Sequence, residues 1–225
     1  MSKSPPSSSS SSGGNGDKSG DDAKRARSER TANRFDARRL EILRTAARMF
    51  SEKGYHQCSL TDVADALNLT KPALYYYAKS KDELLFECGR IALGNLADAV
   101  NDAKTRDLTG REQLDIFFQN YAEMICDDFG RCLVVTEPRD LGPEGRTTNV
   151  KGRRDIEAEV RSMFERGIKD GSIRKCDVKL TTSMLFGAFN SVAGWYREDG
   201  RLTPKTIAAR FMDVVDGGLI PPSTT

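Results

Sequence analysis

Hydrophobic residues recur along this chain every three or four positions, which is the repeat of a helix with one buried face. The first such stripe predicts a helix over residues 35–53 and consists of Ile42, Leu43, Ala46, Ala47 and Phe50. Gly54 follows at once, as the end of a helix favours. No segment shows the sustained alternation of apolar and polar residues that a half-buried strand requires. The pattern therefore predicts an all-α fold.

Two short helices follow, and each has its own N-terminal signal. Ser59, with Asp62 three positions later, resembles a capping box that begins a helix over residues 60–68. Thr70 caps a second helix over residues 71–77, and a proline lies in its first turn, where a missing N–H costs nothing. These lengths are typical of a helix-turn-helix, a motif whose second helix enters the major groove of DNA.

Longer helices are predicted for the rest of the chain, which gives about nine helices in all. A full capping box of Ser80 and Glu83 begins a helix that continues to about residue 103. Glycine and proline breakers predict a loop over residues 137–149. The remaining predicted helices cover residues 112–128, 150–170, 178–197 and 204–216.

Composition divides the chain into three parts. Residues 1–33 are predicted to be a disordered tail, rich in Ser and Gly at first and then basic, because they hold too few apolar residues to repay the entropy of ordering. Residues 34–82 are the predicted three-helix DNA-binding domain, and residues 83–225 are a larger helical domain. The basic part of the tail either stays disordered or lies along a phosphate backbone.

Charge is distributed unevenly between these parts. The whole chain has a formal net charge of +2, but residues 24–82 contain 13 Lys or Arg and only 7 Asp or Glu. A basic N-terminal module on a mildly acidic body indicates a polyanion as the partner of that module. A solvated helix rich in arginine is the other interpretation of the same charge.

Three consecutive tyrosines lie in the second short helix. Leu74 and Tyr77 are three positions apart, so they share a face that packs inward, while Tyr75 and Tyr76 point to a different side. A tyrosine at a DNA surface can donate its hydroxyl to a phosphate oxygen while its ring packs on sugars. We therefore expect Tyr75 and Tyr76 to contact DNA and Tyr77 to pack in the core. The alternative is that all three rings pack the small domain.

The segment AARMFSEKGYHQCSLTDVADALNLTKPALYYYAKSKDELL resembles the DNA-binding domain of the TetR family of bacterial transcriptional regulators. The family pattern often ends the second short helix with Tyr-His-Phe, where this chain has Tyr76, Tyr77 and Ala78, so Tyr77 is expected to replace the packing of that Phe. The resemblance implies DNA contacts from Ser59, Thr61, Thr70, Lys71, Ala73, Tyr75, Tyr76 and Lys81.

The resemblance also implies a repressor that responds to a ligand. Such a regulator would bind a palindromic operator in double-stranded DNA as a homodimer, and a small molecule in its C-terminal ligand-binding and dimerisation domain would lower its DNA affinity. Small residues at helical spacing fit a dimer contact independently: Gly187, Ala188 and Ser191. Packing within one chain is the alternative.

The candidate pocket residues are mostly aromatic, and a stripe of this kind is also what a core contains: Phe117, Tyr121, Met163, Phe186, Phe189 and Trp195. The segment FNSVAGWYREDGRL resembles relatives that sense acyl-CoA thioesters. The basic residues available for the phosphates of CoA are Arg131, Arg139, Arg146, Lys151, Arg153 and Arg154. A solvated surface is the alternative interpretation of that charge.

Other classes of protein find little support in the sequence. His56 is the only histidine, and GxSxG, P-loop and GxGxxG motifs are absent, so we expect no enzyme, cofactor or metal site. The apolar runs are too short to span a membrane, no signal peptide is recognisable, and the five scattered cysteines fit reduced thiols, so we expect a cytoplasmic protein. A helical protein-interaction module without sequence-specific DNA binding is the remaining alternative.

Overall fold

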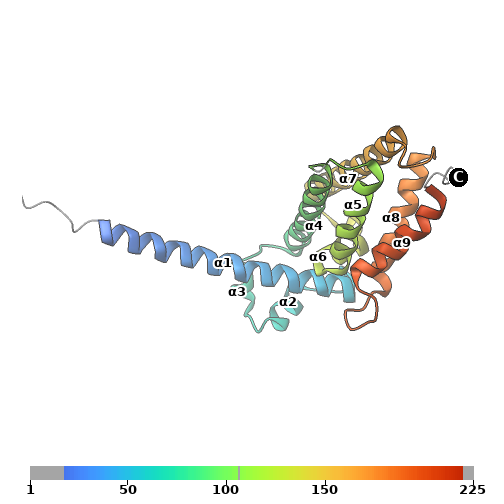
Figure 1. Ribbon diagram of the computed structural model, residues 1–225. Helices are drawn as coiled ribbons and strands as arrows, with labels where there is room; N and C mark the ends of the chain where they lie inside the picture. The colour runs from blue at the N-terminus through green and yellow to red at the C-terminus, as the bar shows by residue number, and fades with distance from the viewer. Residues whose placement is uncertain (1–17, 106, 220–225) are drawn as a thin grey trace, which may run out of the picture. The chain divides into compact units, whose positions relative to one another are not determined.

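The computed structural model describes residues 18–105 and 107–219, and this part of the chain is helical without any strand. Its helices are, in chain order, α1 (Lys18–Lys53), α2 (Leu60–Ala66), α3 (Lys71–Tyr75), α4 (Lys81–Lys104), α5 (Gly110–Cys126), α6 (Asp128–Val135), the 3₁₀ helix η1 (Pro138–Asp140), α7 (Pro143–Asp170), α8 (Val178–Trp195) and α9 (Pro204–Leu219) (Figure 1). The predicted all-α fold is confirmed for these residues.

α1 begins much earlier than the sequence predicted. The sequence predicted a disordered tail over residues 1–33, whereas α1 already includes residues 18–33; residues 1–17 of the predicted tail lie outside the described part. Alanine, arginine and lysine are frequent there and are good helix formers, so local propensity continues the helix. The chain divides into two compact units between Leu40 and Glu41, and the features below belong to the second unit.

Capping boxes begin α2 and α4, but only one of them is complete. The Ser59 hydroxyl accepts the N–H of Asp62, and the Asp62 carboxylate accepts the N–H of Ser59 at 2.7 Å. At α4 the Ser80 hydroxyl accepts the N–H of Glu83, yet the Glu83 carboxylate accepts the N–H of Lys79 at 2.8 Å. The full box predicted at Ser80 is therefore half formed, because the Glu83 carboxylate bonds the residue before the N-cap instead of the N-cap itself.

α7 begins at Pro143, inside the segment of residues 137–149 that was predicted to be a loop. Of the two glycines that indicated a loop, Gly142 is the N-cap of α7 and Gly145 lies at a close helix contact. A Cβ atom on Gly145 would lie 3.2 Å from the side chain of Phe86 on α4. Further along α7, a Cβ atom on Gly152 would lie 2.8 Å from a methyl group of Leu93. Glycine lets α4 and α7 approach each other here.

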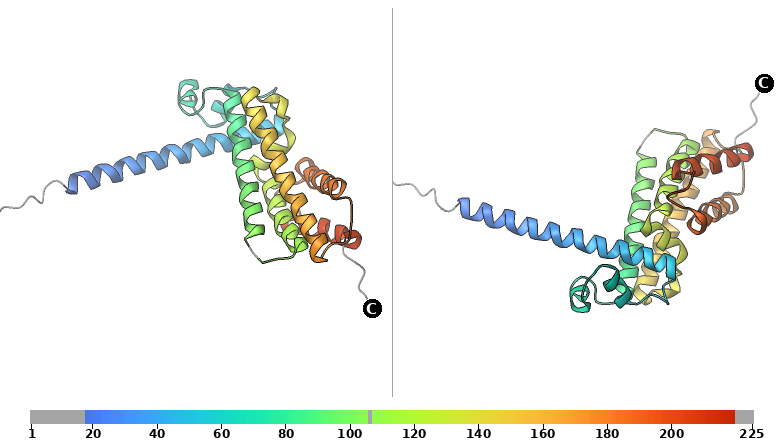
Figure 2. Two further views of the ribbon diagram at one scale, coloured as in Figure 1. Left: turned by 90° about the horizontal axis from the view of Figure 1, so that it is seen from above. Right: turned by 90° about the horizontal axis from the view of Figure 1, so that it is seen from below.

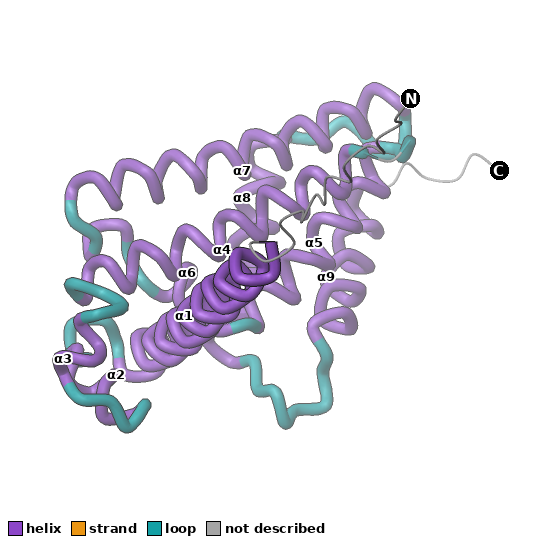
Figure 3. The backbone as a smooth tube through the Cα atoms, turned by 90° about the vertical axis from the view of Figure 1, so that its left-hand side faces the viewer, coloured by secondary structure: helices purple, strands orange, loops and turns teal. Residues whose placement is uncertain are grey.

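α5 packs on α4, α6, α7, α8 and α9. Figure 2 shows α8 and α9 next to each other at one side of this bundle, and Figure 3 shows α4 and α7 running alongside each other. The aromatic residues of α5 are buried, and the Phe118 ring stacks on that of Phe189 in α8 with 4.7 Å between centroids. The sequence did not predict α6, because Asp127 alone separates it from α5 and caps both helices.

Candidate nucleic-acid interface and ligand cavity

α2 and α3 form a helix-turn-helix with a four-residue connection. Within that turn Asn68 adopts a φ of 52°, in the left-handed region that asparagine tolerates. The N–H of Leu69 donates to the carbonyl of Ala64 at 2.8 Å. Val63 of α2 and Leu74 of α3 are both buried in the core. The motif predicted from the two caps is thus formed, with its apolar residues inward.

The three tyrosines differ in exposure as the helical spacing predicted. Tyr75 is 51% exposed and Tyr76 is 73% exposed, whereas Leu74 is buried and Tyr77 packs half-buried against the core. The rings of Tyr76 and Tyr77 meet edge to face, with 5.2 Å between centroids. Ala78, in place of the Phe of the family pattern, is buried. Tyr75 and Tyr76 are accessible to a partner, and their contact with DNA stays a prediction.

Four more of the residues predicted to contact DNA lie on α2 or at the start of α3. Thr70 and Lys71 are exposed, and the Thr70 hydroxyl oxygen accepts the N–H of Ala73 at 3.4 Å. Thr61 and Ala73 are half-buried. The first turn of α3 therefore offers one ammonium group together with small side chains that leave room for a base edge.

Ser59 is exposed, but its hydroxyl already has two partners. It donates to the Asp62 carboxylate at 2.6 Å and accepts the N–H of Asp62 at 3.2 Å. These hydrogen bonds from Ser59 lower the pKa of Asp62. A phosphate oxygen would have to replace the Asp62 carboxylate before it could accept the Ser59 hydroxyl.

Lys81 is held at the first turn of α4 by the turn that follows α1. Its ammonium donates to the carbonyl of Tyr55 at 2.8 Å and lies 4.1 Å from the centroid of the Tyr55 ring. The Tyr55 hydroxyl donates to Asp82 at 2.7 Å, and burial, with this hydrogen bond, raises the pKa of Tyr55. An ammonium has three donors, so Lys81 could still reach a phosphate. Sequence analysis did not predict this cluster.

Polar contacts join α1 and the turn that follows it to the bundle, at residues for which the sequence predicted no such contact. Arg44 of α1 pairs with Asp127 at 2.5 Å, and its guanidinium carbon lies 5.0 Å from the ring centroid of Phe129 on α6. His56 pairs with Asp140 of η1, with 2.9 Å between Nε2 and Oδ1. Nothing in the local sequence connects residues so far apart along the chain.

A cavity of 400 Å³ lies among α4, α5, α6, α7 and α8. Two predicted pocket residues, Tyr121 and Phe186, line it. Phe117, Met163 and Phe189 lie in the core and do not line this cavity. The full lining consists of Leu93, Leu96, Tyr121, Leu133, Val134, Arg153, Ile156, Glu157, Ser183, Phe186, Gly187 and Asn190.

Trp195 lies elsewhere, at the end of α8, and is 46% exposed. It borders a wide polar hollow of 1050 Å³ that is also lined by Arg48 of α1 and Arg131 of α6. The indole N–H donates to the Ser191 hydroxyl at 3.4 Å. Trp195 is therefore not part of the cavity that Tyr121 lines.

Hydrogen bonds fix the polar groups of the cavity. The Tyr121 hydroxyl donates to the side-chain oxygen of Asn190 at 2.7 Å, and burial raises the pKa of this hydroxyl. Arg153 donates through Nε to Asn149 at 2.7 Å and through Nη2 to the carbonyl of Leu133 at 2.5 Å. Arg153 was one of the six basic residues proposed for the phosphates of CoA, with a solvated surface as the alternative, and it lines this cavity as a half-buried side chain.

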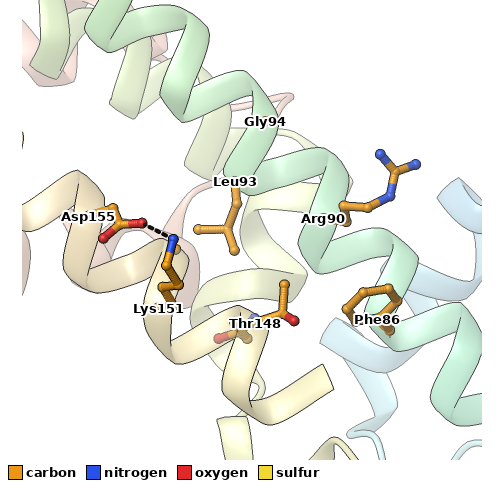
Figure 4. Close-up of a pocket in the computed structure, with 9 residues that line it drawn as sticks. Phe86, Arg90, Leu93, Gly94, Thr148, Lys151 and Asp155 are labelled. Atoms are coloured by element: carbon orange, nitrogen blue, oxygen red, sulfur yellow. Dashed lines mark hydrogen bonds and ion pairs between the residues drawn. The ribbon is translucent and has the colours of Figure 1, made fainter. Parts of the chain in front are cut away.

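A smaller groove of 280 Å³ lies between α4 and α7 (Figure 4). Its walls include Phe86, Arg90 and Leu93 of α4, and Leu93 also borders the cavity. Lys151, one of the cations proposed for the phosphates of CoA, lines this groove and pairs with Asp155 at 3.1 Å.

The six basic residues proposed for the phosphates of CoA do not converge on one place. Arg131 lines the polar hollow, and Arg139 pairs with Glu137; the Arg146 guanidinium donates to the carbonyl of Arg139, and Arg154 is exposed on α7.

Neither a metal centre nor a membrane span is found in the described part of the chain. No group of three or more His, Cys, Asp or Glu is placed there to hold a metal ion. Each helix in these residues is too short or too polar to cross a bilayer.

Two family models match the chain. The model described as bacterial regulatory proteins, tetR family, matches residues 42–88, and the model described as tetracyclin repressor-like, C-terminal domain, matches residues 107–219. The first match contains α2 and α3, and the second contains α5 to α9. Together they cover the reading helices and four of the five helices around the cavity, while most of α4 lies between the two matches.

Similar proteins cover most of the chain. The HTH-type transcriptional repressor KstR2 of Rhodococcus jostii (strain RHA1) is 28% identical over 191 residues, which is 82% of this chain and 92% of that protein. The solved structure of the TetR family transcriptional regulator PfmR from Thermus thermophilus is 31% identical, with a TM-score of 0.70 over 77% of this chain and 96% of that one.

A third similar structure is AibR in complex with isovaleryl coenzyme A and operator DNA. It is 24% identical, with a TM-score of 0.70 over 82% of this chain and 99% of that one, and so demonstrates the shared fold.

Because family models match both domains, an interaction module without DNA binding is not favoured. The chain belongs to the TetR family of bacterial regulatory proteins and is a DNA-binding transcriptional regulator that responds to a ligand.

Proposed function

We propose that this regulator is a repressor that binds a palindromic operator as a homodimer and leaves it when a small apolar molecule, such as an acyl-CoA thioester, enters the cavity of α4 to α8. One observation carries the DNA-binding half of the proposal. α3 buries Leu74 and leaves Tyr75 and Tyr76 exposed beside Lys71. α3 has five residues, and the exposed tyrosines at its last position and its C-cap add little to its stability, so a partner accounts for them better than packing does.

The proposed contacts divide into those that position the protein and those that read bases. Tyr75 and Tyr76 donate to phosphates, and Lys81 adds an ammonium at the start of α4. Lys71 reaches a base edge, where guanine offers two acceptors. Ser59 joins the phosphate contacts once Asp62 releases its hydroxyl. Two half-sites would lie about 34 Å apart, one helical turn of DNA.

Exposed apolar residues on α8 and α9 support the homodimer. Leu180 and Met184 lie on one face of α8 and are 67% and 55% exposed, and Val214 of α9 is 81% exposed. Gly187 continues the same face of α8, and a Cβ atom there would meet no atom within 4 Å. Large apolar side chains next to a small residue are typical of a surface that a second helix covers.

The cavity supports a small effector, because 400 Å³ lies within the usual range for ligand sites. Its walls are mostly apolar, which fits an acyl chain. A similar structure contains isovaleryl coenzyme A and operator DNA, which supports a thioester as the effector class. We further propose that the protein has no catalytic role and acts in the cytoplasm, where its operator DNA lies.

Fluorescence anisotropy with the DNA upstream of the protein's own gene tests this function. The titration is made at several salt concentrations, with and without a panel of acyl-CoA thioesters, and a scrambled duplex of equal length is the control. We expect selective binding whose affinity falls steeply with salt, by about 0.9 log units per log unit of salt for each phosphate contact, and release by one thioester. Binding without release would exclude these effectors, and no selective binding would overturn the proposal.

A further inference from the structure

Arg153 is a half-buried cation at the wall of the cavity, and it has no acidic partner among the described residues. Within the described residues its guanidinium donates to two neutral groups, the side-chain oxygen of Asn149 and the carbonyl of Leu133. Glu157, one turn further along α7, lines the same cavity, but its carboxylate pairs with Arg161 at 3.5 Å. The positive charge of Arg153 therefore has no counter-charge in the described part of the protein.

An unpaired charge inside a protein is costly, and such groups are usually paired or serve a function. Burial lowers the pKa of Arg153, which reflects the same cost. Asn149 and Leu133 orient the guanidinium but do not neutralise it. Of its nitrogens, Nη1 has no hydrogen bond to either residue, so one end of the planar group remains available for an oxygen acceptor.

The rest of the cavity limits what such an acceptor can belong to. Leu93, Leu96, Ile156 and Phe186 contribute apolar walls. The Tyr121 hydroxyl donates its proton to Asn190, and the hydrogen bonds of Arg153 go to Asn149 and Leu133 instead of to this tyrosine. The best complement is a molecule with an apolar body and one oxygen-bearing group at the Arg153 end.

We propose that Arg153 binds the carboxyl group of an apolar effector, either as the carboxylate of a free acid or as the carbonyl of its thioester. This rests on the proposed function, which places the effector in this cavity. Both sources present a carboxyl-derived oxygen to the guanidinium, and a charge-assisted hydrogen bond is the stronger kind. A carboxylate also supplies the missing counter-charge.

Arg153 is also a positioning residue for α6. Its Nη2 bond to Leu133 holds the last turns of that helix, while Arg44 of α1 pairs with Asp127 at the other end. An effector that draws the guanidinium toward itself weakens the Leu133 bond. The change reaches α1 through eight residues of helix, so ligand occupancy is transmitted to the DNA-reading domain.

Isothermal titration calorimetry on the protein without DNA tests the inference. The probes are octanoate, octanoyl-CoA and octan-1-ol, which share one chain, together with the polycyclic carboxylate cholate. Arg153→Gln removes the charge, and Arg153→Lys keeps it but lacks the planar fork. Arg166→Gln is the matched control, because Arg166 is exposed on the same helix, does not line the cavity and is not among the residues proposed for the phosphates of CoA.

We expect Arg153→Gln to weaken the binding of carboxyl-bearing probes by roughly 10- to 100-fold, Arg153→Lys to weaken it less, and Arg166→Gln to leave it unchanged. A loss confined to the acids identifies the carboxylate, and a loss confined to octanoyl-CoA identifies the thioester carbonyl. Octan-1-ol should bind weakly and equally to all variants.

Three results would overturn the inference: equal affinity of the wild type and Arg153→Gln for every probe, octan-1-ol binding as tightly as octanoate, or no binding of any carboxyl-bearing probe. Thermal unfolding shows whether Arg153→Gln is folded, and Arg153→Lys keeps the test valid if it is not. Operator binding without effector is measured separately. A failure there in the wild type counts against the proposed function and leaves the calorimetric result to decide this inference.

Discussion

α3 and α5 both carry clusters of aromatic residues, and they use them in opposite ways. α3 exposes Tyr75 and Tyr76, whereas α5 buries Phe117, Phe118 and Tyr121 among the helices around it. In α5 the rings stabilise the bundle, so removing one should lower the free energy of unfolding. In α3 the rings add little to folding, so removing one should lower the affinity for the operator. The comparison separates residues that hold the fold from residues that serve a partner.

The largest effect on stability is expected from Phe118→Ala. The side chain is fully buried and its ring stacks on Phe189 at 4.7 Å, so its loss leaves a cavity in the bundle. We expect the free energy of unfolding to fall by about 3–5 kcal/mol, measured by urea denaturation. A change below about 1 kcal/mol would show that the bundle collapses around the gap and would weaken the contrast with α3.

Tyr76→Ala should have the opposite profile. The side chain is 73% exposed, so we expect the free energy of unfolding to change by less than about 1 kcal/mol. Operator affinity should fall by about 10-fold for each subunit that loses a phosphate contact. Anisotropy and denaturation on the same preparation give both values. Unaltered operator affinity together with a large loss of stability would assign Tyr76 to packing.

Lys71→Ala sharpens the comparison within α3, because it removes charge instead of a ring. Lys71 is exposed at the first turn of that helix. We expect weaker operator binding and, where Lys71 also meets a phosphate, a salt slope smaller by about 0.9. Lys169→Ala, at the exposed end of α7, is the matched control and should alter neither value. Equal effects of both substitutions would mean that net charge alone guides binding.

Ser59→Ala is expected to have the smallest effect. It removes the cap of α2 and should lower stability by about 1 kcal/mol. The pKa of Asp62 is lowered in the folded protein, so its contribution to stability is present above the ordinary aspartate pKa and is lost as the pH falls through the lower, folded value. Thermal unfolding between neutral and acidic pH should therefore depend less on pH in Ser59→Ala. Identical profiles would show that the capping box does not form in solution.

The reading helices could be predicted closely because their signals are local. Gly54, with a φ of 85°, ends α1 as expected, and Ser59 and Thr70 cap α2 and α3. The inward orientation of Leu74 was predicted from its spacing of three residues from Tyr77, which places both on one face of the helix. Each of these signals involves residues within one or two helical turns of each other, so it can be recognised in the sequence alone.

The cavity could not be predicted in the same way, because it depends on which side of each long helix faces its neighbours. Arg153 belongs to a basic run that has the composition of a solvated surface, yet the packing of α7 turns this one side chain inward. Phe117 and Phe189 are aromatic residues of the kind that often line a pocket, yet they fill the core. α6 was missed because a single capping residue, Asp127, redirects the chain without a glycine or proline signal.

The position of Trp195 has a practical consequence. It is the only tryptophan of the chain, its indole is half exposed, and it shares a hollow with Arg48 of α1 and Arg131 of α6. Any movement between α1 and the end of α8 changes the polarity around that indole, and with it the wavelength of its emission. Trp195 is thus a native fluorescent reporter of movement between α1 and the end of α8, and no dye has to be attached to follow that movement.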